Sequence, residues 1–194
     1  MAEPLDKSEA VPGLEFENSI VLRPAERWKD AILADLIEHI ESRHHVFTRN
    51  QLVKLEALLD TASRDSGASL PHLEKARSQF QTLRRDLSEH LEKEELHLFA
   101  GIRAMENGGP IPTGLQDVRG LLDAAREEHL ATKALLALLD DRGRSNPVPA
   151  TPNASLEAFQ LGLKELEEDL HLHVYLENSL LFPRVLAEAE ARRR

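Results

Sequence analysis

The sequence predicts an all-α protein, an up-down-up-down four-helix bundle. Leucine is abundant, whereas β-branched and aromatic residues are sparse, and this balance favours helix over sheet. Four long segments carry apolar residues at helical spacing, and a short break follows each of the first three. Helices of about 30 residues joined by short connections pack as antiparallel neighbours in a bundle. We expect them at about residues 25–63, 71–105, 113–141 and 153–191.

The first two helices have recognisable ends. Ser66 and Gly67 break the first helical pattern. The second helix is expected to start near Pro71, because proline suits a first helical turn. Asn107-Gly108-Gly109-Pro110 is a strong stop signal. The stripe of the first helix contains Ile37, His45, Leu52, Leu55 and Leu59. The stripe of the second contains Phe80, Leu83, Leu87, Leu91 and Leu98.

The third and fourth helices are separated by residues 142–152, a linker with three prolines and no apolar period. The fourth helix should begin at a capping residue, either Asn153 or Ser155. Pro183 lies inside it and should kink or locally loosen the last turns. The stripe of the third helix contains Leu115, Val118, Leu122, His129, Leu136 and Leu139. The stripe of the fourth contains Phe159, Leu163, Leu166, Leu170, Val174 and Leu181.

The bundle is expected to occupy residues 24–191 of the chain. Residues 1–23 have mixed polarity, two prolines and no period, so we interpret them as a flexible lead-in. Leu14, Phe16 and Ile20 are the side chains through which this lead-in would dock. Residues 192–194 form a basic tail, whose positive charge complements the dipole at a helix C-terminus.

Composition narrows the classes of function. The formal net charge of −10 argues against sequence-independent binding to nucleic acid or to anionic membranes. The sequence contains no Cys, which excludes disulfides, thiolate metal sites and Cys nucleophiles. No segment approaches the length of a membrane span, and the acidic N-terminus lacks the apolar core of a secretory signal. A cytoplasmic location is therefore expected.

Two His/Glu pairs carry the strongest chemical signal. His90 and Glu94, and likewise His173 and Glu177, stand four residues apart, which places each pair on one helix face. Both faces also carry the apolar stripe, so the four side chains should be buried. Burying imidazoles and carboxylates without partners is costly, and a metal ion is the usual partner. Histidine with carboxylate is a ligand set suited to iron.

The first and third helices each add one histidine to this set, His45 and His129. Four His and two Glu at matching depth would supply two iron ions with two imidazoles each. The two carboxylates and a solvent-derived oxo or hydroxo bridge would join the metals. Open positions would remain for a small diatomic ligand, NO or O2, or for a peroxide.

Simpler interpretations apply to each residue alone. An isolated His-x-x-x-Glu is usually an exposed helix pair, and a lone His129 is more often a hydrogen-bonded core residue. The coincidence on four stripes favours the metal site. His44 adjoins His45 and stays an alternative ligand, and Glu41 is either a supporting partner of His45 or an extra ligand. The surface or supporting histidines are His39, His72, His97 and His171.

Three segments resemble the hemerythrin-like domain and, within it, the di-iron repair of iron centres proteins. They are HLEKEELHLF, EEHLATKALL and DLHLHVYLENSLLFPR, the last being the most specific. The resemblance covers about residues 28–187 and implies a four-helix bundle. It implies four His ligands and two bridging Glu. These are His45, His90, His129, His173, Glu94 and Glu177.

The sequence departs from relatives within this family. Lys133 stands where oxygen-carrying hemerythrins have a second third-helix His, and the last pair is His173/Glu177 instead of His/Asp. Four His and two Glu form the repair-type set, so reversible oxygen storage is not expected. Full-length repair proteins often carry an N-terminal domain with a Cys pair, and the sequence lacks that pair. Ala100 replaces a common proline, which should alter only local helix geometry.

The resemblance implies a role in nitrosative or oxidative stress. The implied activity is iron supply to damaged iron–sulfur apoproteins, or reaction with nitric oxide. The alternatives are an oxygen- or nitric-oxide-binding sensor module, an enzyme that reduces peroxide or nitric oxide with an outside reductant, and a purely structural bundle. Iron lability would favour iron supply, a stable oxygen adduct would favour the sensor module, and multiple turnover would favour the enzyme.

Overall fold

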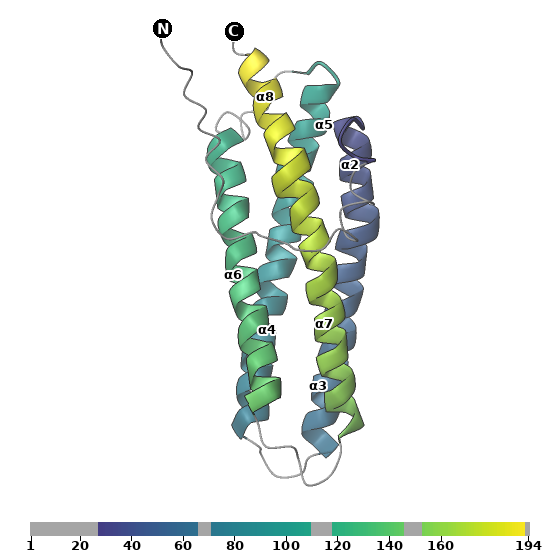
Figure 1. Cartoon of the computed structure of the whole chain (residues 1–194), viewed down its shortest axis with the longest axis vertical. Helices are drawn as coiled ribbons and strands as arrows, with labels where there is room; N and C mark the ends of the chain where they lie inside the picture. The colour runs from purple at the N-terminus through teal and green to yellow at the C-terminus, as the bar shows by residue number, and fades with distance from the viewer. Residues whose placement is uncertain (1–26, 66–70, 110–117, 146–152, 193–194) are drawn as a thin grey trace, which may run out of the picture.

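The computed structural model describes residues 27–65, 71–109, 118–145 and 153–192, and of residues 71–72 and 140–145 it describes the backbone only. Over these residues the chain forms four long helical rods that lie side by side (Figure 1). The described residues contain helices and turns and no strand, so the expected all-α bundle is confirmed. The proposed lead-in with Leu14, Phe16 and Ile20 lies outside the described residues, as do Arg193 and Arg194.

Three of the four rods are interrupted by a π-helical segment. The first rod consists of α2 (Leu33–His39), η1 (Ile40–His45) and α3 (Val46–Asp65). The second consists of α4 (Pro71–Lys93), η2 (Glu94–Phe99) and α5 (Ala100–Glu106). The third is α6 (Val118–Ser145) alone, and the fourth consists of α7 (Ala154–Tyr175), η4 (Leu176–Leu181) and α8 (Phe182–Arg192). α3 and α6 each contact both α4 and α7, which gives a four-sided bundle.

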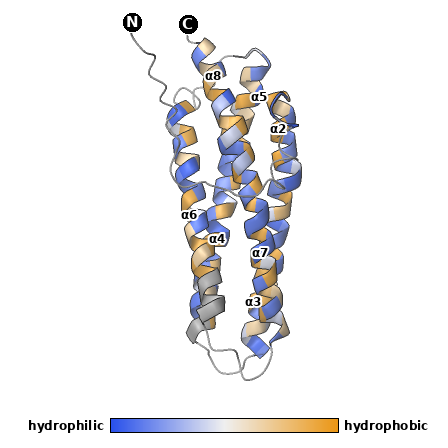
Figure 2. Ribbon diagram, in the orientation of Figure 1, coloured by the Kyte–Doolittle hydropathy of each residue, from blue (hydrophilic) through white to orange (hydrophobic). Residues whose placement is uncertain are grey.

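The apolar core is divided into two clusters along the bundle axis. Hydrophobic residues recur along every rod among hydrophilic ones, as an amphipathic helix requires (Figure 2). One cluster, the lower cluster, includes Leu55 of α3, Leu83 of α4, Leu136 of α6 and Leu166 of α7. The other, the upper cluster, includes Ile37, Phe99, Leu122 and Phe182 from the same four rods.

A band of buried polar residues separates the two clusters. Along the first and third rods the chain passes from the upper cluster through the band to the lower cluster. Along the second and fourth rods this order is reversed, as an up-down-up-down bundle requires. The band consists of His44, His45, Thr48, His90, Glu94, His129, His173 and Glu177, all of them buried. The four stripes therefore bring their polar residues to one depth in the bundle.

The first helix begins later than the sequence predicts. It starts at Leu33, not near residue 25, because a partner from the second rod caps it. Leu33 N–H donates to Glu106 Oε1 at 2.7 Å, and Ala34 N–H donates to Glu106 Oε2 at 2.8 Å. A carboxylate at this position satisfies free amides and interacts favourably with the helix dipole.

The other helix ends follow local signals more closely. α4 starts at Pro71 and the rod ends at Glu106, after which Gly108 adopts a left-handed φ of 77°. Asn153, not Ser155, caps α7 by accepting from Leu156 N–H at 2.9 Å. The helix α6 extends through Ser145, so the first residues of the expected linker are helical; residues 113–117 and 146–152 lie outside the described part.

Pro183 lies in the first turn of α8, directly after the π-helical segment η4. The rod continues to Arg192, so the proline does not end it. Proline cannot donate the backbone hydrogen bond of a regular turn, and the widened turn before it accommodates that loss. The local loosening expected from the sequence is therefore a π-helical turn.

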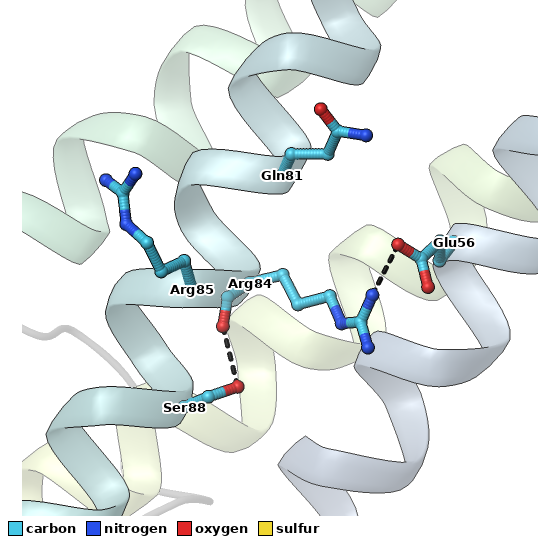
Figure 3. Close-up of a pocket in the computed structure, with 5 residues that line it drawn as sticks. All are labelled: Glu56, Gln81, Arg84, Arg85 and Ser88. Carbon is cyan, nitrogen blue, oxygen red and sulfur yellow. Dashed lines mark hydrogen bonds and ion pairs between the residues drawn. The ribbon is translucent and has the colours of Figure 1, made fainter.

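The surface of the bundle has one shallow hollow of note, between α3 and α4 (Figure 3). Arg84 pairs with Glu56 across it, and Ser88 Oγ donates to the backbone oxygen of Arg84 at 2.7 Å. Gln81 and Arg85 complete its lining. None of the residues of the buried polar band lines this hollow. Among the described helices, none combines the length and apolar character that a membrane span requires.

Candidate metal centre

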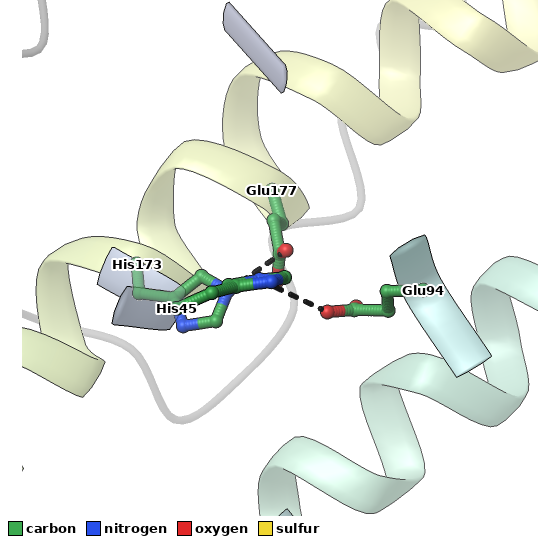
Figure 4. A group of neighbouring side chains, drawn as sticks. All are labelled: His45, Glu94, His173 and Glu177. Carbon is green, nitrogen blue, oxygen red and sulfur yellow. Dashed lines mark hydrogen bonds and ion pairs between the residues drawn. The ribbon is translucent and has the colours of Figure 1, made fainter. Parts of the chain in front are cut away.

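Six predicted side chains converge in the buried polar band. They form two groups of four, each with two imidazoles and the same two carboxylates. The first group contains His45, Glu94, His173 and Glu177 (Figure 4), and its donor atoms all lie within 4.8 Å of one another. The second group contains His90, Glu94, His129 and Glu177. Glu94 and Glu177 therefore belong to both groups, and each rod contributes one histidine.

The first group, called here the His45/His173 group, is compact. His45 Nε2 lies 3.2 Å from His173 Nε2, and His173 Nε2 lies 2.9 Å from Glu177 Oε1. Glu94 Oε2 lies 3.5 Å from His45 Nε2. Two ligand atoms bound about 2.1 Å from one ion at a right angle are about 3 Å apart, so this spacing fits a shared metal.

The second group, called here the His90/His129 group, repeats this arrangement with the other carboxylate oxygens. His129 Nε2 lies 3.0 Å from His90 Nε2 and 3.1 Å from Glu177 Oε2. Glu94 Oε1 lies 3.3 Å from His90 Nε2. Each carboxylate thus directs one oxygen to each group, which is the arrangement that a bridging carboxylate requires.

Two further carboxylates hold the outer nitrogens of two imidazoles. His45 Nδ1 lies 2.7 Å from Glu95 Oε1, and Arg49 donates to both oxygens of Glu95. An ionised carboxylate only accepts, so His45 Nδ1 carries the proton and Nε2 presents a free electron pair to the centre. Metal-binding histidines commonly have this support.

The second rod repeats this support at His90. His90 Nδ1 lies 2.7 Å from Glu128 Oε2, and Lys93 Nζ donates to Glu128 Oε1 at 2.7 Å. Neither Glu95 nor Glu128 was predicted from the sequence. The only sequence signal was adjacency, since Glu95 follows Glu94 and Glu128 precedes His129. Adjacency on a helix does not say which neighbouring rod a side chain faces.

Burial shifts the protonation of two of these histidines, His45 and His90, toward the neutral, metal-binding form. Desolvation, with the neighbouring His173, lowers the pKa of His45 to about 4. Desolvation and His129 likewise lower the pKa of His90. Both imidazoles are therefore uncharged near neutral pH, which is the state that binds a cation.

The two shared carboxylates lie in opposite electrostatic environments. Burial raises the pKa of Glu94 well above its ordinary value, and the neighbouring Glu177 adds to the rise. Burial acts in the same direction on Glu177, but His173 and His129 outweigh it and hold the pKa of Glu177 well below its ordinary value. Neither oxygen of Glu94 has a hydrogen-bond partner among the described residues. A divalent cation would satisfy these oxygens, so the donor set fits iron.

The sequence left His44 and Glu41 open as alternative or additional ligands, and the structure places both outside the two groups. His44 lies outside both groups, and its Nδ1 lies 3.0 Å from Asp169 Oδ2. Glu41 accepts two hydrogen bonds from Arg103 and belongs to neither group. Of the remaining histidines, His97 is exposed, His39 and His171 are half-buried, and the side chain of His72 lies outside the described part of the chain.

The π-helical segments coincide with the centre. η1 ends at His45, η2 begins at Glu94, and η4 contains Glu177 as its second residue. A π-helical turn holds more residues than an α-helical turn, so consecutive residues can both face the core. His44 and His45 are both buried at the end of η1.

Comparison with known proteins agrees with this geometry. The family model described as the hemerythrin HHE cation binding domain matches residues 19–185. The chain is similar to the iron-sulfur cluster repair protein YtfE of Escherichia coli O157:H7, of Escherichia coli O81 (strain ED1a) and of Escherichia fergusonii. Each is 33% identical over 167 residues, which cover 85% of this chain and 72% of the relative. The chain therefore belongs to the hemerythrin HHE cation-binding domain family.

Proposed function

We propose that this chain binds two iron ions and supplies iron for the repair of iron–sulfur clusters damaged by nitrosative or oxidative stress. The observation that carries the proposal is the sharing of both carboxylates between two histidine pairs. The similarity to proteins named for iron-sulfur cluster repair supports the choice of function. A solvent-derived oxo or hydroxo bridge would also join the two ions in the resting state.

Each residue of the centre has a defined part in this proposal. His45 and His173 would hold one ion and His90 and His129 the other, while Glu94 and Glu177 bridge them. Bound iron would supply open coordination positions and, when ferrous, exchangeable ions. Glu95 and Glu128 orient one imidazole on each side, and the apolar clusters exclude water above and below.

The binding half of the proposal is tested by metal analysis. The chain, reconstituted with ferrous iron, should hold about two irons and develop an oxo-bridge absorption band in the near ultraviolet. Zinc incorporated during expression is the artefact to exclude, because the same ligands bind zinc. A clean preparation that tightly binds only one iron, or none, would contradict the proposal.

The repair half is tested by transfer. Reduced, iron-loaded protein is mixed with a dehydratase whose iron–sulfur cluster has been damaged by nitric oxide. The recovery of dehydratase activity is then followed. Free ferrous iron at equal concentration and a His129→Ala/Glu177→Ala variant are the controls. Recovery faster than with free iron is expected. Recovery no faster would favour a sensor module that binds nitric oxide or oxygen, and a persistent adduct would then be sought.

A further inference from the structure

His44 is built like a metal ligand although it belongs to neither metal-binding group. Its side chain is buried, and its Nδ1 lies 3.0 Å from Asp169 Oδ2. Arg43 Nη1 lies 3.6 Å from the other oxygen of Asp169. Imidazole, carboxylate and cation follow one another here in the same order as His45, Glu95 and Arg49, and as His90, Glu128 and Lys93.

The second ring nitrogen of His44, Nε2, is buried and unpartnered in the described part of the chain. Because Asp169 accepts from Nδ1–H, Nε2 presents an unshared electron pair. A buried polar atom without a partner is costly, so this unpartnered nitrogen points to a ligand that visits the site.

His44 lies against only one of the two metal-binding groups. Its ring is nearly parallel to that of His173, at 15°, with the centroids 5.9 Å apart. In the other group, the ring that lies parallel to His129 is the phenyl ring of Phe182, at a centroid distance of 6.4 Å. Phenyl cannot bind a metal, so the two groups differ in whether an additional imidazole stands beside them.

The line of rings continues from His44 toward the surface. His39 meets the edge of His44 with the ring centroids 5.4 Å apart. His39 is half-buried, and its other side stacks on Trp28 at 4.5 Å. An ion held between two imidazoles places their nitrogens about 4 Å apart, at about 2.1 Å from each, so small side-chain rotations would connect successive rings.

We infer that His44 is a transient ligand through which ferrous iron enters and leaves the His45/His173 group, with His39 as the next ligand outward. The inference rests on the proposed function, since it concerns the path of the iron to be supplied. The step is a ligand exchange. His44 Nε2 would replace His173 Nε2 as a ligand of the leaving iron, with no change in oxidation state or in the number of protons. The His90/His129 group lacks this path and should release its iron more slowly.

The test follows iron loss from the reduced, two-iron protein to the chelator ferrozine in a stopped-flow experiment. The unmodified protein should lose iron in a fast and a slow phase. His44→Phe keeps an aromatic ring against His173 but removes the metal-binding nitrogen. It should bind two irons with an unchanged ferric spectrum, while its fast phase slows about tenfold, a change typical for loss of a supporting metal contact.

Two further variants make the result decisive. His39→Phe should also slow the fast phase of iron loss. Because His39 is only half-buried, this variant tests the path even if His44→Phe does not fold. His97→Phe makes the same substitution at an exposed histidine of η2 and should change nothing. An unchanged fast phase in His39→Phe would overturn the path. Binding of only one iron by a folded His44→Phe would overturn it too, because His44 would then be a permanent ligand.

Failure of this inference differs from failure of the proposed function. A protein that holds two irons and restores the dehydratase, yet releases iron equally fast with and without His44, retains its function and lacks this path. A protein that holds no iron pair loses both proposals. The iron content and the chelator kinetics separate these results without any measurement of repair activity.

Discussion

Glu94 and Glu177 differ from the four histidines in that each carboxylate faces both histidine pairs. We expect Glu94→Ala and Glu177→Ala each to perturb both irons, because one oxygen of each lies near each pair. His173→Ala and His129→Ala should each chiefly weaken one iron, since an imidazole nitrogen serves a single ion. Mössbauer spectra of the four iron-loaded variants measure this. Single-site losses in the Glu variants would mean that the carboxylates are terminal ligands.

Glu95 and Glu128 support one histidine on each side, and their replacement should act on one side only. Glu95→Gln keeps the shape but not the charge that holds His45 Nδ1–H, so we expect iron affinity at that group to fall about 10-fold to 100-fold. Glu128→Gln should do the same at the His90/His129 group. Iron titrations with Mössbauer detection distinguish the groups. Glu41→Gln, which alters only the pair with Arg103, is the matched control.

The lowered pKa of His45 should make the free energy of unfolding of the metal-free protein depend on pH. Its pKa is lowered from 6.5 to about 4 by burial and by His173. Between these values the unfolded chain binds a proton that the folded chain does not, so the free energy of unfolding falls as the pH falls. Relative to His45→Phe, the free energy of unfolding of the unmodified protein should fall by about 3 kcal/mol between about pH 8 and pH 4. Urea unfolding across this range measures the difference, and a constant difference would contradict it.

The convergence of the six candidate ligands could be predicted from sequence, whereas the side chains that support them could not. Spacing of four along a helix places His90 with Glu94 and His173 with Glu177 on one face, which is local information. The contacts from Glu95 to His45 and from Glu128 to His90 join residues 50 and 38 positions apart. They depend on how two rods are rotated against each other, and one sequence does not carry that angle.

At the scale of the elements, helix identity follows apolar periodicity, and helix boundaries follow capping contacts. Asn153 caps α7 within its own turn and was predictable, because an Asn before an apolar stripe is a start signal. The start of α2 depends on Glu106 of α5, 73 positions away from Leu33. The π-helical turns were also beyond prediction from periodicity, since each shifts the stripe by only about one residue.

Glu106 offers a test of this distant cap. Glu106→Ala removes the acceptor of two amides and a negative charge at the start of α2, so we expect the protein to lose about 1–2 kcal/mol of stability. The amides of Leu33 and Ala34 should exchange hydrogen faster than those of α3. Glu89→Ala, at an exposed position of α4, is the control. Unchanged exchange at these two amides would mean that the helix start does not depend on Glu106.

At the scale of the whole molecule, two apolar clusters enclose a band of buried polar residues. The clusters contain residues from all four rods, so each holds the bundle together above or below the band. The band should destabilise the metal-free fold, because Glu94 is buried and neither of its oxygens is hydrogen-bonded among the described residues. Stability and metal binding are thus set by different layers of the same bundle.

This separation predicts that Glu94→Leu stabilises the metal-free protein while it abolishes stabilisation by iron. Leu replaces a buried carboxylate, whose pKa burial raises, with an apolar group, and this removes the desolvation cost of an unsatisfied buried group, about 1–3 kcal/mol. Thermal unfolding with and without ferrous iron should show a higher Tm for the metal-free variant and a large iron-dependent rise in Tm only for the unmodified protein. Leu83→Ala, within the lower cluster, should instead lower both Tm values, because it creates a cavity away from the ligands. A lower Tm for metal-free Glu94→Leu would mean that the polar band contributes to folding before any metal binds.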